Sequence, residues 1–128
     1  MAQEKNIKAY KVENAAELLT GEGTMRPFLF TENLSLIHLE IPAGMEVAPH
    51  AHPKDGHLFC LAGELEVMCG DQRLTVTRNT ALVVPANVTC GVSNKSGAPV
   101  ECLLISAPPT FKSAEELKAV IEQHKAKN

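Results

Sequence analysis

Two histidines separated by one residue, His50 and His52, are the side chains of this sequence best suited to chemistry. They follow Gly44 in a stretch that continues through an apolar run to Gly63. In an extended chain, residues two apart point to the same face and lie about 6–7 Å apart. Two imidazoles on one face can hold a metal ion at distances of about 2.0–2.1 Å. The spacing therefore predicts part of a metal site, and a pair of surface histidines in a loop is the alternative.

A longer motif surrounds the two histidines. Its form is G(x)5HxH(x)3–4E(x)6G, and four of its positions are filled at the expected spacing by Gly44, His50, His52 and Gly63. A second motif, G(x)5PxG(x)2H(x)3N, aligns with residues 79–94, where Pro85 and Asn94 match. With these two motifs the sequence resembles the cupin family over roughly residues 34–107. The resemblance implies an all-β fold, a single double-stranded β-helix or jelly-roll barrel.

The departures from the motifs fall on the metal ligands. The family's glutamate aligns with Gly56 and its third histidine with Cys90. The resemblance thus implies a divalent metal held by His50, His52 and Cys90, with His57 or water completing the shell. His57 points outward under strict alternation and inward if a bulge intervenes. A nitrogen and thiolate set favours zinc, and iron, copper, nickel and manganese remain open.

Alternation also sends Leu58 and Cys60 toward the barrel interior, where they are candidates for contact with a substrate. Two further departures concern the backbone: Asn79 and Asn87 stand where the family has glycines. Asparagine tolerates the left-handed conformation better than other non-glycine residues, so we expect both turns to be preserved.

Three functions follow from these residues. By resemblance to cupin enzymes, the metal would support oxygenation, isomerisation or lysis of a small polar molecule. The alternative is a barrel without metal chemistry that binds a small ligand or acts as a sensor. A third hypothesis is thiol chemistry at Cys90, with His50 or His52 as the base.

The elements that position these residues can be read from hydrophobic alternation and turn signals. Residues 1–33 are predicted to form an arm, a short helix at 15–20 and the first strands, residues 34–107 the barrel, and residues 108–128 a C-terminal helix. That helix begins with the capping box Ser113 to Glu116 and carries the apolar stripe Leu117, Val120, Ile121, His124. Strands are predicted at 27–30, 34–41, 58–62, 64–69, 74–78, 81–84, 88–92 and 100–107.

Two kinds of side chain on these strands are expected to be structural. Glu64 and Glu66 alternate with apolar residues and should lie on a solvated face. His38 should lie on the outer face of its strand, away from any ligand set.

Composition limits the class of protein. A chain of 128 residues with 45% hydrophobic residues and a net charge of −3 is typical of one soluble domain. The charge and the 4% aromatic content argue against nucleic acid as a partner. Neither a signal peptide nor a membrane span is evident, so we expect a cytoplasmic protein, and the resemblance suggests a homodimer.

The four cysteines contain no CxxC pair and are expected to be reduced thiols in the cytoplasm. Cys69 reads as a strand-end residue without a role. Cys102 should pack as a small apolar side chain.

Overall fold

The computed structural model describes residues 6–126, and within them strands form two antiparallel sheets accompanied by one α-helix. One sheet has six strands in the order β1 (Leu18–Thr20), β2 (Gly23–Phe30), β3 (Ser35–Ile41), β10 (Val100–Ser106), β5 (Gly56–Ala62), β8 (Ala81–Val84). The other has four in the order β4 (Glu46–His50), β9 (Cys90–Ser93), β6 (Glu64–Cys69), β7 (Gln72–Thr77). The all-β barrel predicted from the sequence is confirmed.

The two sheets enclose a core made by alternate residues of their strands. Ile37, Leu39 and Ile41 of β3 are buried, as are Leu65 and Val67 of β6. Branched apolar side chains at every second position suit a strand with one buried face. Each predicted strand from residue 34 onward is present, with ends shifted by two residues or fewer.

The N-terminal part of the chain differs from the prediction. The helix expected at residues 15–20 is absent, and the only helical turn before β1 among residues 6–17 is the 3₁₀ turn η1 at Val12–Asn14. In place of the predicted helix, β1 pairs with β2, so that Leu18 lies opposite Met25. Both side chains are buried in the core, and this burial outweighs a marginal local helix signal.

The turns agree closely with the sequence. Asn79 and Asn87 have φ angles of 68° and 64°, which confirms that they take the left-handed conformation of the glycines they replace. Asn94 is fully buried, and its Nδ2 donates to the carbonyl oxygens of Ile41 and Ala98. The motif asparagine therefore joins the turn after β9 to the end of β3.

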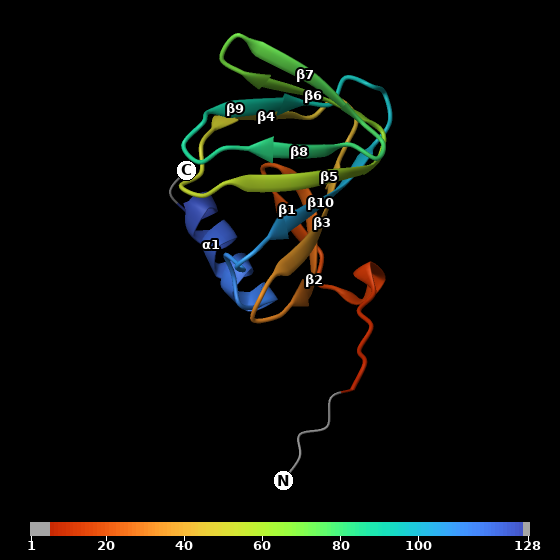
Figure 1. Ribbon diagram of the computed structural model, residues 1–128, viewed down its shortest axis with the longest axis vertical. Coiled ribbons are helices and arrows are strands. Elements are labelled where there is room, and N and C mark those ends of the chain that lie inside the picture. Colours follow the sequence, from red (N-terminus) through yellow and green to blue (C-terminus); the bar gives the residue numbers. More distant parts are fainter. Residues whose placement is uncertain (1–5, 127–128) are drawn as a thin grey trace.

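The helix α1 (Ala114–Ala126) lies beside the six-stranded sheet (Figure 1). The Ser113 hydroxyl accepts a hydrogen bond from the Glu116 backbone N–H, as the capping box predicts. Leu117 is buried in the core and Ile121 packs against it, whereas the side chain of His124 lies outside the described residues. In the described part of the chain, no helix combines the length and the apolar character needed to cross a bilayer.

Candidate metal centre

The two histidines lie where β4 ends. His50 is the last residue of the strand and half-buried, and His52 follows it in an exposed loop. Their ring centroids are 4.7 Å apart and the ring planes are nearly perpendicular, at 86°. The structure thus brings the predicted pair together with both rings accessible to an ion.

A bulge in β4 turns His50 toward the barrel interior. The β4–β9 ladder pairs Val47 with Val92 and His50 with Cys90, so two residues of β4 stand opposite one residue of β9. That one residue is Gly91, and a Cβ added there would come within 3.2 Å of the Pro49 side chain. Strict alternation would place His50 on the face opposite Val47, and the bulge restores it to the same face.

Glu22 completes a group of three candidate ligands. One ligand atom from each of Glu22, His50 and His52 lies within 4.8 Å of the others. The Glu22 Oε1 atom is 3.4 Å from His50 Nε2. Glu22 lies in the two-residue turn between β1 and β2, where the Thr20 hydroxyl accepts the Glu22 backbone N–H and donates to the Gly23 carbonyl oxygen.

Hydrogen bonding prepares His50 as a ligand. Its Nδ1 lies 2.9 Å from the carbonyl oxygen of Ala48, which can only accept a hydrogen bond, so Nδ1 carries the proton. In the neutral imidazole the lone pair is then on Nε2, the atom that faces Glu22. A backbone carbonyl that holds the far ring nitrogen is the usual support of a metal-binding histidine.

The loop that carries His52 is tied to the turn between β8 and β9. The Asn87 backbone N–H donates to the His52 carbonyl oxygen at 2.7 Å. The Ala86 N–H donates to Asp55 Oδ1 at 2.8 Å. The left-handed Asn87 therefore helps to place the second imidazole.

The donor set fits a divalent transition metal. Two imidazole nitrogens and a carboxylate oxygen are typical of non-haem iron(II), zinc and related ions. Ligand atoms around such an ion lie no more than about 4.2 Å apart, twice the usual bond length. The three atoms here, within 4.8 Å, need only a small contraction to reach that spacing.

Cys90 requires a correction. It is joined to Cys69 by a disulfide, with the two Cα atoms 4.3 Å apart, so the prediction of four reduced cysteines is wrong for these two. In this state Cys90 has no thiolate to offer a metal ion. Sequence reasoning missed the bond because it depends on the pairing of β6 with β9, strands about twenty residues apart.

The remaining candidates lie away from the three ligands. His57 is exposed and lines an apolar hollow on the outer face of the six-stranded sheet, so the inward bulge considered for it does not occur. Cys60 is buried without accessible surface, which removes it from contact with a substrate. Leu58 is half-buried, packs against the core and borders the same hollow as His57. His38 bonds to Glu101 at 3.0 Å, in keeping with a structural role.

Glu22 is the site residue that the sequence did not reveal. The family's glutamate position falls on Gly56, and the replacement comes from a hairpin outside the two motifs. A signal existed in the run Gly21-Glu22-Gly23, which suits a tight turn between two strands. The helix predicted at residues 15–20 would end at this run, and that prediction leaves no strand to form the hairpin.

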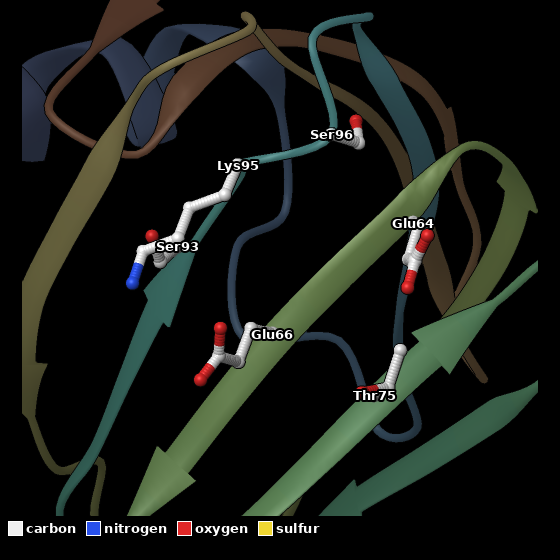
Figure 2. Close-up of a pocket in the computed structure, with 6 residues that line it drawn as sticks. All are labelled: Glu64, Glu66, Thr75, Ser93, Lys95 and Ser96. Carbon is white, nitrogen blue, oxygen red and sulfur yellow. The ribbon is translucent and has the colours of Figure 1, made fainter.

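A separate polar hollow of about 140 Å³ lies over β6, β7 and β9 on the outer face of the four-stranded sheet (Figure 2). Its lining residues are Glu64, Glu66, Thr75, Ser93, Lys95 and Ser96. The Glu66 carboxylate pairs with Arg73 at 3.1 Å, and the Glu64 side chain is exposed. These acids stay on the face opposite the core and are not the missing metal ligand.

The family model of the cupin domain matches residues 37–106. Among solved structures, the polyketide cyclase RemF from Streptomyces resistomycificus has a TM-score of 0.68 at 17% identity, covering 90% of this chain and 93% of that one. An RmlC-like cupin from Methanocaldococcus jannaschii has a TM-score of 0.62 at 21% identity, covering 82% and 94%. At these identities the likeness concerns the fold alone. Among curated proteins, none matches this sequence.

Proposed function

Because this chain belongs to the cupin family, we propose that it is a metal-dependent cupin in which Glu22, His50 and His52 hold one divalent transition metal ion. The observation that carries this proposal is the position of Glu22. A hairpin turn far from the histidines in sequence brings the one missing carboxylate within 3.4 Å of His50 Nε2. In this position the Glu22 carboxylate and the His50 imidazole can bind the same ion together with His52.

The donor set narrows the metal and the chemistry. Replacing the expected thiolate by a carboxylate shifts the metal preference from zinc toward iron(II) or manganese(II), two of the ions left open by the sequence. Three protein ligands leave coordination positions free for water or substrate. When bound, the ion would polarise an oxygen atom of a small polar molecule or activate water or dioxygen. Oxygenation, isomerisation and lysis are therefore the reactions we propose.

This chain's own residues would orient and support that chemistry. The His50 ring is held by the Ala48 carbonyl oxygen, so it need not be ordered at the moment of binding, and the backbone of His52 is held by Asn87. The exposed His52 leaves one side of the site open to solvent and to a substrate. On the side of β9 the site borders the core, because His50 pairs with Cys90, a member of the buried cluster.

Elemental analysis of protein purified without a histidine tag tests the proposal. We expect about one equivalent of a transition metal in the wild type and little in His52→Ala. His57→Ala is the matched control and should keep its metal, because His57 lies on the outer face of β5. Wild-type protein that remains metal-free after reconstitution with iron, manganese and zinc would contradict the proposal.

The alternative is a cupin without metal chemistry that binds a small ligand or acts as a sensor. It is favoured by the departures at two of the family's ligand positions, which are occupied by Gly56 and Cys90. Loss of small hydroxy- and keto-compounds in the presence of metal-loaded protein would favour the enzyme. Saturable binding of one of them without consumption would favour the sensor.

We also propose that the protein is a homodimer. The outer face of the six-stranded sheet has a hollow of about 540 Å³ whose apolar lining includes Phe59, Leu103 and Ile105. Val83, on the same face, is 58% exposed. A continuous apolar face of this kind is typical of an interface, and a second copy offers the same face in return.

A further inference from the structure

We propose that the Cys69–Cys90 disulfide is a redox switch on the metal site: its reduction frees the Cys90 thiol to become a fourth ligand beside Glu22, His50 and His52. This inference rests on the proposed metal site. It adds that the site has two states, an open three-ligand state when oxidised and a closed four-ligand state when reduced.

The strand register places the switch beside the ligands. His50 of β4 lies directly opposite Cys90 of β9, and directly paired residues share one face of a sheet. On the other side of β9, the Met68–Gly91 pair puts Cys69 of β6 next to Cys90. The three residues therefore form a row across neighbouring strands. Cys90 is the central residue of this row. Its sulfur can bond either to Cys69 on one side or to a metal ion beside His50 on the other.

The two cysteines of the disulfide differ in their exposure to solvent. Cys90 is 7% exposed and belongs to the core, whereas Cys69 is half-buried at the end of β6, next to the exposed turn Gly70-Asp71. A thiol from solution therefore reaches the Cys69 sulfur more readily, and attack there displaces Cys90 as the leaving thiolate. The freed Cys90 thiol stays on the residue that pairs with His50.

The second pair of cysteines provides a contrast within the same chain. Cys60 and Cys102 also lie opposite each other, on β5 and β10, but both are fully buried. Burial raises the pKa of the Cys102 thiol to about 12, with the neighbouring Cys60 adding to the shift. That pair is inert to exchange, so redox chemistry is confined to the pair beside the metal site.

The reaction balances with ordinary thiols. One molecule of a small thiol forms a mixed disulfide with Cys69, and a second releases Cys69 as a thiol. The products are two protein thiols and one small-molecule disulfide. When a metal ion then binds, the Cys90 thiol loses its proton to solvent and a metal–sulfur bond forms. A reducing environment would favour the four-ligand state, and an oxidising environment the three-ligand state with its disulfide intact.

The two states differ in what they can do. For zinc, which is usually tetrahedral, three protein ligands leave a free position, whereas four protein ligands close the shell, as in structural zinc sites. Reduction should therefore raise affinity for a thiophilic ion and lower access for substrate. Oxidation should reopen the site.

Cobalt(II) and zinc binding to four forms of the chain tests the switch. The forms are wild type oxidised, wild type reduced by a phosphine that is then removed without air, Cys69→Ser and Cys90→Ser. Cys69→Ser leaves Cys90 free under all conditions, and Cys90→Ser never offers the thiol. Circular dichroism verifies that both variants are folded before they are compared.

We expect reduction of the wild type to raise zinc affinity by about tenfold to a hundredfold. Mutation of a residue that supports a metal ligand changes metal affinity by the same range. The reduced protein and Cys69→Ser should show a thiolate-to-cobalt charge-transfer band. Oxidised wild type and Cys90→Ser should lack it. Equal affinities in both redox states, or a band that persists in Cys90→Ser, would overturn the switch.

The same titration separates the two proposals. If His50→Ala abolishes binding by oxidised protein but reduction changes nothing, the metal site stands and only the switch is overturned. If His50→Ala and oxidised wild type bind equally weakly, the three-ligand site fails and the switch falls with it.

Discussion

At position 22 a carboxylate lies in a hairpin turn with its Oε1 atom 3.4 Å from His50 Nε2. The charge on that carboxylate and the lone pair on Nε2 converge on the same small volume, together with His52. In the absence of an ion, such a pair at the protein surface contributes little to stability, about 0–1 kcal/mol. The Glu22–His50 pair therefore matters for binding an ion rather than for the stability of the fold.

Glu22→Gln should lower metal affinity by about tenfold to a hundredfold, because the amide keeps the shape of the side chain and loses its charge. Titration calorimetry with manganese(II) or zinc measures the change. Glu32→Gln, an exposed glutamate in the turn between β2 and β3, is the control and should bind as the wild type does. Unchanged affinity in Glu22→Gln would remove Glu22 from the site.

Thiol reactivity should divide the cysteines into two classes. Burial raises the pKa of both Cys60 and Cys102, so each is a protonated, inaccessible thiol at pH 8. After mild reduction, we expect iodoacetamide to label Cys69 first in native protein, and Cys60 and Cys102 only after unfolding. Peptide mass spectrometry reads the sites. Rapid native labelling of Cys102 would show that the β5–β10 interior opens.

At the scale of elements, the site depends on two local departures from regular strands. The β1–β2 hairpin presents Glu22, and the bulge in β4 turns His50 inward. Gly23, next to Glu22, has a φ of 127°, and a Cβ there would run into the backbone carbonyl oxygen of Glu40 on β3. Only glycine lets β2 approach β3 at this point.

Gly23→Ala should therefore destabilise the fold by about 1–3 kcal/mol and weaken metal binding by displacing the turn. Gly21→Ala is the matched control, because a Cβ at that position meets no atom within 4 Å. Urea unfolding and a metal titration on both variants measure the two effects. Equal stability of the two variants would contradict the close approach of β2 and β3.

Regular elements could be predicted from the sequence, and departures from regularity could not. Alternation located β6 to the residue and a short apolar run located β8, and the turn chemistry of asparagine predicted the left-handed Asn79 and Asn87. The helix expected at residues 15–20 was wrong, because Leu18 gains more by facing Met25 in the core than by helix formation. Local pattern carries no information about such a partner.

The candidate site shows the same division. Two of its ligands, His50 and His52, follow from spacing within one loop. Glu22 and the Cys69–Cys90 bond depend on which strands become neighbours, and that is decided by the fold as a whole. The sequence of a single strand specifies its register only weakly. The sequence alone therefore could not show that Cys90 lies next to Cys69 and forms a disulfide with it.

At the scale of the whole molecule, the two sheets are covered unequally. The four-stranded sheet turns a polar outer face to solvent, with the hollow of Figure 2 lined by charged and hydroxyl side chains. The six-stranded sheet turns out an apolar surface over β5, β8 and β10. This asymmetry is expected if one face is shared with a second copy and the other is not.

Val83→Asp should convert the proposed dimer into a monomer, because it buries a charge at the centre of the apolar face. Light scattering coupled to size exclusion measures the molar mass. Leu74→Asp, on β7 of the other sheet, where Leu74 is 42% exposed, is the control and should stay dimeric. A monomeric wild type at micromolar concentration would rule out this interface.

The most direct test of the central claim is an anomalous difference map from crystals of the oxidised protein grown with zinc or manganese. We predict one strong peak bonded to the Glu22 carboxylate, to His50 Nε2 and to a ring nitrogen of His52. A peak elsewhere, for example in the polar hollow beside Glu66, or none at saturating metal, would contradict the account.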